Sequence, residues 1–232
     1  MELCDDPLIT TLREYRSNLL QGRNSANRYS WDMAKFEVCC HKFADLSEHG
    51  YGVSILNDSK YGFATCGNLM RLSLLRAPKA PDAHADMGRH HIRWAILPHQ
   101  GDLSSTTVRT AYNFNNPLKL AQAPAGFSAS VAENPIKLTG NPSLILDCVK
   151  RGEDDEDVSR GELAVRKGKS VILRIYDSLG GTSKGTIETS LDVKRVFRTN
   201  ILEDDEDELK IVKGKVDVTL RPFEVATFRL QL

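Results

Sequence analysis

Two short clusters of cysteine, histidine and aspartate side chains are the first places in this sequence where chemistry could occur. Cys39, Cys40 and His41 are consecutive. These three consecutive residues are too crowded to converge on one metal ion, and a zinc site would need a second close Cys or His pair. A His-Asp-His set between His84 and His90 offers nitrogen and oxygen ligands that zinc accepts, so it stays open as a metal site on residue type alone.

Two acidic runs, Glu153 to Asp157 and Glu203 to Glu208, are the densest groups of charge. A calcium-binding loop would space its carboxylates around a glycine at a fixed place, and neither run does so. Adjacent carboxylates repel one another and need water, which predicts that both runs are solvated loops. We expect the first run to mark the boundary between two β domains.

Motifs of several enzyme classes are missing from the chain. It contains no nucleophile elbow, P-loop, dinucleotide-binding fingerprint or zinc-protease helix. Lys+Arg and Asp+Glu both number 31, so the net charge of zero favours neither nucleic acid nor an acidic membrane as a partner. Residue chemistry alone therefore predicts a soluble β protein without a stated activity.

The sequence contains few features that indicate a cellular compartment. The five cysteines are an odd number with two adjacent members, which indicates free thiols in a reducing compartment rather than a disulfide framework. Acidic Glu2, Asp5 and Asp6 stand where a signal peptide carries positive charge. No stretch approaches the roughly 18 apolar residues of a membrane span. We expect neither a signal peptide nor a membrane anchor.

The elements that would position these residues are mostly strands. Residues 6–22 have the caps and apolar spacing of one amphipathic helix, and the polar stretch from Gly22 to Ser30 resembles a linker. From Trp31 onward the apolar period becomes two, and turn signals recur at short spacing, which predicts antiparallel sheets packed as a sandwich. The predicted inward positions are Met70, Leu72, Leu74, Ile92, Trp94, Ile96, Val216, Val218, Leu220, Ala226, Phe228 and Leu230.

A second, short helix is expected from Ser105 to Phe114, with Val108, Ala111 and Tyr112 facing inward and an Asn-Asn-Pro sequence ending it. The length of 232 residues allows two β domains. We predict a lead and linker at 1–29, a larger β-sandwich at 30–149 and a smaller terminal β domain at 150–232.

From about residue 30 to the end, the chain resembles the C-terminal region of glycoside hydrolase family 38, in the fungal vacuolar and animal cytosolic type of α-mannosidase. The resemblance is carried by Tyr29–Asp32, Phe36–Val38, His41–Ser47, Gly50–Val53, Leu56–Gly62, Leu72–Asp82, Ala85–His90, Leu97–His99 and Leu220–Phe228. Residues 1–29 depart from the family pattern, which has Pro-Thr-His and Asn-Thr ahead of Ser-Trp-Asp. That departure suggests a truncated or rearranged gene product.

The resemblance implies a galactose-mutarotase-like sandwich followed by a smaller one. It also implies hydrolysis of terminal α-mannosides by a retaining mechanism, with two carboxyl groups about 5 Å apart. In this family the nucleophile and a zinc-type ion lie in an upstream catalytic domain. The resemblance therefore assigns no catalytic residue, metal ligand or bound cofactor to this chain, and it argues against the His-Asp-His metal site. We expect the isolated chain to be inactive.

The same resemblance implies that loops of the β domains complete the sugar pocket. Two segments are candidates, and the predicted substrate-binding residues are Asn57, Asp58, Lys60, Arg76, Asp82, Asp86, Arg89 and His90. The first segment offers an amide, a carboxylate and an ammonium group to sugar hydroxyls, although Asn-Asp is also ordinary hairpin chemistry. The second is a long irregular segment whose arginines could instead pair with its aspartates to hold the loop.

Mannose-containing oligosaccharides, the missing catalytic domain or further subunits are the expected partners, with no nucleic acid and no membrane. The expected location is cytoplasmic or vacuolar. A different class of function remains open, namely a non-catalytic module that binds glycans or docks onto a mannosidase subunit. An exposed apolar patch would favour the docking function.

Overall fold

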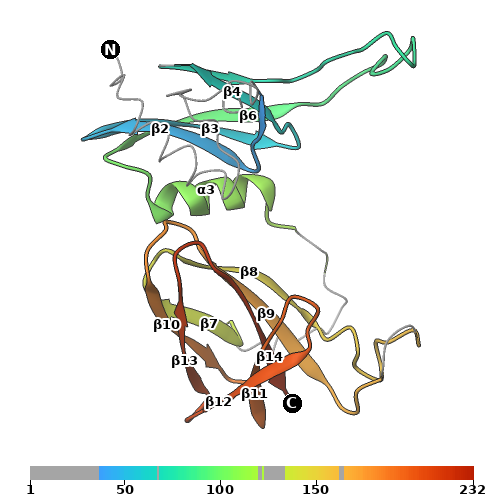
Figure 1. Cartoon of the computed structure of the whole chain (residues 1–232), viewed down its shortest axis with the longest axis vertical. Coiled ribbons are helices and arrows are strands. Elements are labelled where there is room, and N and C mark those ends of the chain that lie inside the picture. The colour runs from blue at the N-terminus through green and yellow to red at the C-terminus, as the bar shows by residue number, and fades with distance from the viewer. Residues whose placement is uncertain (1–36, 67, 120–121, 123–133, 162–164) are drawn as a thin grey trace. The chain divides into compact units, whose positions relative to one another are not determined.

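Antiparallel sheets make up nearly all of the regular structure (Figure 1). The computed structural model describes residues 37–66, 68–119, 122, 134–161 and 165–232. The chain divides into two units, of which the first ends at Leu120 and the second begins at Ala121. The helix predicted at residues 6–22, the linker after it and Trp31 lie outside the described residues.

The strands described in the first unit form two three-stranded sheets. One has the order β2-β3-β6 and the other β1-β4-β5. The bounds are β1 Val38–Cys39, β2 Phe43–Glu48, β3 Tyr51–Asp58, β4 Gly62–Cys66, β5 Leu69–Leu72 and β6 Arg93–Gln100. Ala44 and Ile55 of the first sheet pack with Cys40 and Phe63 beside the second, so the core of this unit lies between the sheets.

The helix predicted near Ser105 is present as α3, Ser105–Asn115. Val108 and Ala111 are buried, as the apolar spacing predicted. The backbone N–H of Asn116 donates to the Tyr112 carbonyl (2.9 Å), which ends the helix at the predicted place. The Asn115 side chain donates to the carbonyl of Asn57 (2.9 Å) and thereby ties α3 to β3.

The inward face predicted for β6 is wrong. Trp94 and Ile96 are 50% and 59% exposed, whereas Ala95, Leu97 and His99 on the opposite face are partly buried. The cause is that both faces of this strand carry apolar residues, so the period of two does not choose between them.

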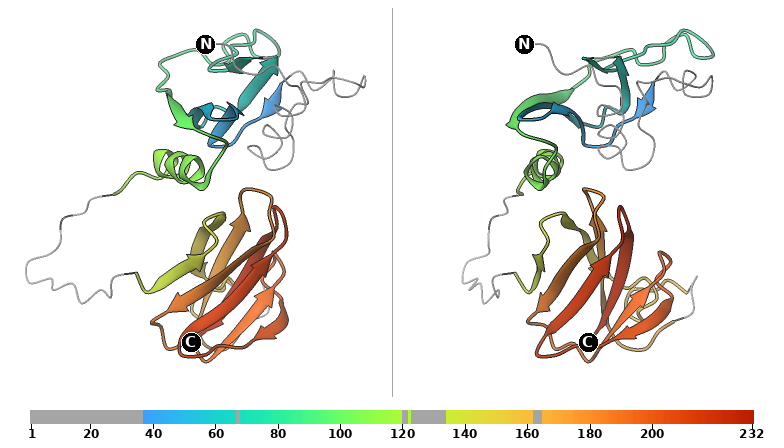
Figure 2. Two further views of the ribbon diagram at one scale, coloured as in Figure 1. Left: turned by 90° about the vertical axis from the view of Figure 1, so that its left-hand side faces the viewer. Right: turned by 60° about the vertical axis from the view of Figure 1, so that its left-hand side comes forward.

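A β-sandwich forms the second unit (Figure 2). A sheet of order β13-β10-β7 stacks on one of order β12-β11-β14-β9-β8. The bounds are β7 Ile136–Gly140, β8 Leu144–Arg151, β9 Ser170–Asp177, β10 Ser183–Thr189, β11 Arg195–Thr199, β12 Asp205–Leu209, β13 Lys215–Leu220 and β14 Val225–Gln231. Aliphatic residues of both sheets and Phe228 form one buried cluster between them. The predicted mainly β, antiparallel fold with two β domains is confirmed.

The domain boundary predicted between residues 149 and 150 needs correction. It falls inside β8, and the chain divides between Leu120 and Ala121 instead. The acidic run that suggested the boundary is a loop within the second unit, since it follows β8 and leads back to β9, with which β8 pairs. The acidic run is part of a loop, as predicted, but this loop is not a linker between the two units.

The alternation predicted for the last two strands is confirmed only in part. Val216, Val218 and Leu220 of β13 are buried and their neighbours are exposed. On β14 the predicted inward residues are buried, but Thr227 and Arg229 on the opposite face are buried too, at 3% and 0% exposure. The face of β14 that carries Thr227 and Arg229 is therefore not exposed to solvent. Arg229 has charged partners from other segments of the chain.

Candidate ligand-binding cleft

A cleft of about 760 Å³ in the first unit gathers half of the predicted substrate-binding residues. Its lining residues are Glu37, Ser59, Lys60, Tyr61, Gly62, Ser73, Leu74, Leu75, Arg76, Asp86 and His90. Lys60, Arg76, Asp86 and His90 were predicted, and they come from the two candidate segments. Asn57, Asp58, Asp82 and Arg89 do not line it.

The turn after β3 divides its polar residues between core and cleft. Asn57 is completely buried, and its side-chain amide approaches the Cys40 carbonyl at 3.4 Å, so it is a core residue. Asp58 accepts a hydrogen bond from Arg93 Nε at 2.7 Å on the neighbouring strand. Ser59 has a positive φ of 74°, and this bend of the backbone precedes Lys60 and Tyr61 in the cleft lining.

Backbone N–H groups, rather than arginines, bind the carboxylates of the long segment between β5 and β6. Asp82 Oδ1 accepts from the N–H of His84 (2.8 Å), and Asp86 Oδ2 accepts from the N–H of Ala77 (3.1 Å). His90 Nε2 lies 2.7 Å from the Asp86 carbonyl oxygen. Within this described segment neither Arg76 nor Arg89 forms the ion pair that sequence allowed. The loop is held by side chain to backbone bonds instead.

The structure gives no support to a metal site at this segment. Within the described ranges, no group of three or more His, Cys, Asp or Glu side chains is arranged to hold a metal ion. His90 reaches the backbone oxygen of Asp86 rather than converging with its carboxylate. A zinc-type ion does not fit the residues present here, so no step of chemistry is assigned to one.

Two lining residues that were not predicted as site residues shape the cleft. The ring of Tyr61 is 46% exposed and lies 4.6 Å from the His41 ring, centroid to centroid. Glu37 accepts a hydrogen bond from Ser73 Oγ. Both lie in strings that carry the family resemblance, but nothing in the residue pattern indicated that they meet around one cavity.

The charged side chains that line the cleft differ in whether they have partners within the chain. Each of its carboxylates already has a hydrogen-bond donor, Glu37 from Ser73 and Asp86 from Ala77. Lys60 and Arg76 have no ion pair with any residue that the structure describes. The charged side chains of the lining are thus two cations and two carboxylates, beside the aromatic ring of Tyr61.

Sequence reasoning also missed a buried Asp-His pair in the same unit. Asp45, 1% exposed, accepts hydrogen bonds from Ser47 Oγ (2.7 Å) and Ser54 Oγ, and His99 Nε2 lies 2.6 Å from it. A nucleophilic triad places the imidazole between the hydroxyl and the carboxylate. Here the carboxylate is in the middle, so the serines are not activated as nucleophiles and the cluster has a structural role.

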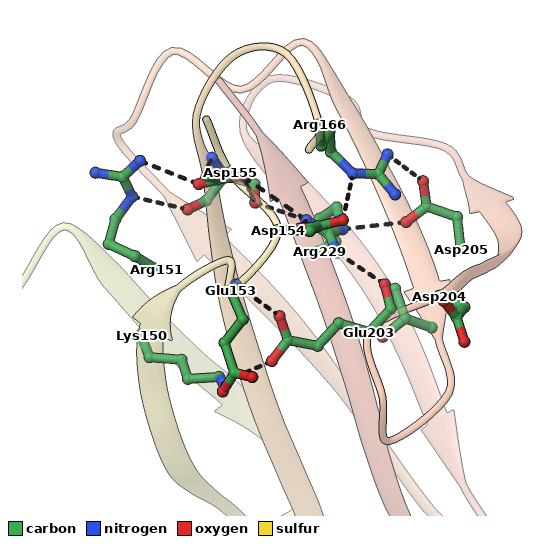
Figure 3. A network of polar contacts seen from close by, with 12 residues as sticks. Lys150, Arg151, Glu153, Asp154, Asp155, Arg166, Glu203, Asp204, Asp205 and Arg229 are labelled. Carbon is green, nitrogen blue, oxygen red and sulfur yellow. Dashed lines mark hydrogen bonds and ion pairs between the residues drawn. The ribbon is translucent and has the colours of Figure 1, made fainter. Parts of the chain in front are cut away.

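The two acidic runs of the second unit meet around Arg229 (Figure 3). Its Nη1 lies 2.8 Å from Asp154 and its Nε lies 3.1 Å from Asp205, while Nη2 donates to the Glu203 carbonyl at 2.7 Å. Asp155 is completely buried, and Glu203 is 5% exposed. The prediction that both runs are simply solvated loops is wrong for these residues.

Further basic side chains complete this network. Arg166 bridges Asp154 (3.0 Å) and Asp205 (2.7 Å), as Figure 3 shows, and Arg151 binds Asp155 at 3.0 Å. Burial acts to raise the pKa of Asp154, but hydrogen bonds from Arg229 and Arg166 hold that pKa below its usual range. A depression of about 390 Å³ lies beside the network. Because its charges are largely paired within the chain, we assign it a structural role.

Two family models match the chain. Residues 20–84 match the glycosyl hydrolases family 38 C-terminal domain, and residues 143–228 match the C-terminal beta sandwich domain of the same family. The first match contains the turn after β3 and part of the segment after β5. The second lies within the sandwich unit.

Curated relatives extend both matches. An alpha-mannosidase of Saccharomyces cerevisiae is 50% identical over 210 residues, which cover 87% of this chain and 19% of that protein. Alpha-mannosidase 2C1 of Homo sapiens is 36% identical over 206 residues, covering 88% of this chain and 19% of that one. The chain thus spans about a fifth of the length of the curated relatives it matches.

The fold has a counterpart among solved structures. An alpha-mannosidase from Enterococcus faecalis aligns with a TM-score of 0.64 at 17% identity, covering 84% of this chain and 21% of that one. At this identity the likeness concerns the fold alone. The match agrees with the two β domains described above.

Proposed function

Because the chain belongs to glycoside hydrolase family 38 and corresponds to the C-terminal region of its members, we propose that its first unit forms part of the wall of a mannoside-binding pocket. The enzyme it would serve is an α-mannosidase that hydrolyses terminal α-mannosides in oligosaccharide breakdown. The observation that carries the proposal is the cleft in which Lys60, Arg76, Asp86 and His90 meet.

The chemistry of the cleft suits a sugar. The exposed ring of Tyr61 offers an apolar face of the kind on which a pyranose stacks, and the ammonium and guanidinium groups donate hydrogen bonds to hydroxyl oxygens. The lining mixes these donors with Leu74 and Leu75. Small-ligand sites commonly have this mixture of apolar walls and a few polar groups.

Catalysis is a separate matter. A retaining glycosidase needs a carboxylate nucleophile and a carboxylic acid about 5 Å apart on either side of the bond it breaks. The chain covers only about a fifth of each curated alpha-mannosidase that it matches. We therefore assign the nucleophile, the acid and a zinc-type ion to the remainder of the α-mannosidase, and the 232-residue chain alone should not hydrolyse mannosides.

Titration of the purified chain with mannose tests the binding role directly. We expect saturable binding by calorimetry, weakened roughly three- to ten-fold in Tyr61→Ala because a stacking surface is lost. Trp94→Ala is the matched control, since it removes an exposed aromatic residue that does not line the cleft. Equal losses in the two variants, or no binding at all, would argue against the proposal. Turnover of an aryl mannoside by the chain would contradict the assignment of catalysis elsewhere.

A docking module is the second candidate function, and the exposed face of β6 favours it. Trp94 and Ile96, at least half exposed, are neighbours on one face of this strand. Exposed apolar groups of this kind often mark protein contacts. The partner would be the upstream part of the mannosidase or a further subunit, in the cytoplasm or the vacuole. Within the described ranges, no helix combines the length and apolar character of a bilayer crossing.

Co-purification with the upstream part of the Saccharomyces cerevisiae relative separates the two candidates. If β6 docks, Trp94→Ala should reduce co-purification while Tyr61→Ala leaves it unchanged. If Tyr61→Ala weakens mannose binding in the titration and Trp94→Ala does not, the chain has both roles, on different surfaces. Co-purification that neither variant affects would remove the argument for docking through β6.

A further inference from the structure

We infer that Cys39 is a site of reversible thiolation, at which a zwitterionic peptide thiol of the glutathione class forms a mixed disulfide. This inference goes beyond the proposed function and does not depend on mannose binding. It follows from an exposed thiol on β1, an imidazole in contact with that thiol, and a cleft beside it whose lining carries charges of both signs.

The Cys39 thiol has a base within reach. Its Sγ lies 3.0 Å from Nε2 of His41, and the His41 ring lies against the ring of Tyr61. An imidazole in this position can accept the proton of the thiol, and the thiolate is the form that attacks a disulfide. Because Cys39 is exposed, a soluble disulfide can approach its sulfur.

The adjacent cysteine differs in both respects. Successive side chains of a strand point to opposite faces, and Cys40 is buried where Cys39 is exposed. The Cys40 sulfur lies 3.4 Å from the side-chain amide of Asn57, and burial raises the pKa of its thiol to about 12. Cys148, on β8 of the other unit, is partly buried and provides an internal reference. Reaction is therefore expected at Cys39 and not at Cys40.

The exchange needs no oxidant other than a disulfide. The proton of Cys39 passes to Nε2 of His41, and the thiolate attacks one sulfur of glutathione disulfide. A bond forms between Sγ and that sulfur while the S–S bond of the reagent breaks, and the departing glutathione thiolate takes the proton from the imidazolium. Cys39 is oxidised and one glutathione is released in its reduced form, so excess reduced glutathione reverses the step.

The cleft beside Cys39 suits a peptide that carries both signs of charge. Cys39 lies opposite Gly62 in the β1–β4 register, and Gly62 lines the cleft. Glu37, two positions before Cys39, lines it as well. The lining combines its two carboxylates with the cations of Lys60 and Arg76. The ammonium and carboxylate groups of glutathione can pair with these residues, whereas a neutral thiol such as mercaptoethanol cannot.

Reaction of the folded chain with glutathione disulfide near neutral pH, read by peptide mass spectrometry, tests the site. We expect Cys39 to be modified at least about ten-fold faster than Cys148, and His41→Gln to slow the reaction at Cys39 by a similar factor, because the base is lost. His49→Gln, at an exposed histidine between β2 and β3, is the matched control and should keep the full rate. Near pH 10 the His41→Gln and unmodified rates should converge, since cysteine thiols ionise there without a base.

Competition between glutathione and mercaptoethanol, each with its disulfide, tests the class of ligand. On Cys39 of the folded chain we expect glutathione to exceed mercaptoethanol by about two- to five-fold more than in urea, as for ion pairs in an open site. Arg76→Gln should lower this preference. Arg71→Gln, which removes an exposed arginine outside the lining, should keep it.

The contrary outcomes are distinct from those of the proposed function. Modification of Cys148 as fast as Cys39, or an unchanged rate in His41→Gln, overturns the inference. Rates that stay apart near pH 10 overturn it too, because His41 would then act on access to the thiol rather than on its proton. An equal preference in the folded chain and in urea shows that the cleft contributes nothing, with the same consequence. Failure to bind mannose leaves the inference standing, since thiolation is read by mass.

Discussion

The guanidinium of Arg229 lies 2.8 Å from the carboxylate of Asp154, although 75 positions separate them in the chain. Arg229 is completely buried, so the desolvation of its charge must be offset by the carboxylates and hydroxyl around it. Asp205 and Ser170 supply two of those contacts, at 3.1 and 2.9 Å. The loop after β8 and the start of β12 are thus joined to the middle of β14.

Replacing Arg229 with methionine should destabilise the sandwich unit by about 3–5 kcal/mol, because Asp154, Asp155 and Asp205 would lose a shared counter-charge. The measurement is urea unfolding followed by hydrogen exchange of β14 amides, which reports on this unit rather than on the whole chain. Arg195→Met is the matched control. Arg195 pairs with Glu208 at 2.7 Å on the surface, so its loss should leave β14 exchange nearly unchanged. Equal effects of the two substitutions would contradict a special role for burial.

Acid should unfold the sandwich unit through Asp154 and Asp177. Burial acts to raise the pKa of Asp177, but hydrogen bonds from the Phe223 and Gly180 N–H groups and from two serines hold it below its usual range. A pKa that is lower in the folded state contributes stability above the unfolded value, about 3.9 for Asp, and that stability is lost as pH falls through the folded value. Urea midpoints for β9 and β14 exchange should therefore be flat above about pH 5 and drop below about pH 4.

Asp177→Asn tests the origin of that drop. It should lower stability at pH 7 and flatten the acid decline, because an amide does not titrate and cannot accept all the bonds from the Ser143 and Ser183 hydroxyls and the backbone. Asp192→Asn, at an exposed carboxylate between β10 and β11, should leave the curve unchanged. An unaltered acid limb in the first variant would rule out Asp177 as a contributor.

The alternation of apolar and polar residues along a strand predicted the features that depend on neighbouring residues alone. The alternation of Val216, Val218 and Leu220 fixes the inner face of β13 because each polar neighbour can reach water. The same argument placed Phe228 correctly but not Arg229, since the partners of Arg229 on the outer face of β14 are residues 24 and 75 positions away. No window of sequence around β14 contains that information.

The residues that line the cleft could likewise be predicted only in part from the sequence. Residues of both segments that the resemblance suggested line one cleft, but Asn57 and Lys60 are three positions apart, and one is in the core while the other lines the cleft. Which residue faces the cavity depends on the bend at Ser59 and on the position of α3, whose Asn115 binds the carbonyl of Asn57. Composition also could not show which charges would be neutralised by other residues of the chain.

Cys39 and Cys40 should differ sharply in reactivity. Burial raises the pKa of the Cys40 thiol to about 12, so it carries almost no thiolate at pH 8, whereas Cys39 is exposed with its Sγ 3.0 Å from His41 Nε2. Iodoacetamide at pH 8 should label Cys39 and spare Cys40 in the folded chain, as read by peptide mass spectrometry. Labelling of both in 8 M urea is the control. Modification of Cys40 at the Cys39 rate without denaturant would show that this part of the unit opens readily.

Asn57→Asp should destabilise the first unit by at least about 2 kcal/mol, because it places a carboxylate without a cation in a fully buried position. Trp94 lies directly across from Asn57 in the β3–β6 register, so its fluorescence in a Trp31→Phe background reports on this unit during urea unfolding. Lys60→Gln is the matched control and should leave the midpoint unchanged, since Lys60 lines the open cleft. If the Asn57→Asp variant were stable and bound mannose differently, the assignment would be reversed, making position 57 a ligand contact rather than part of the core.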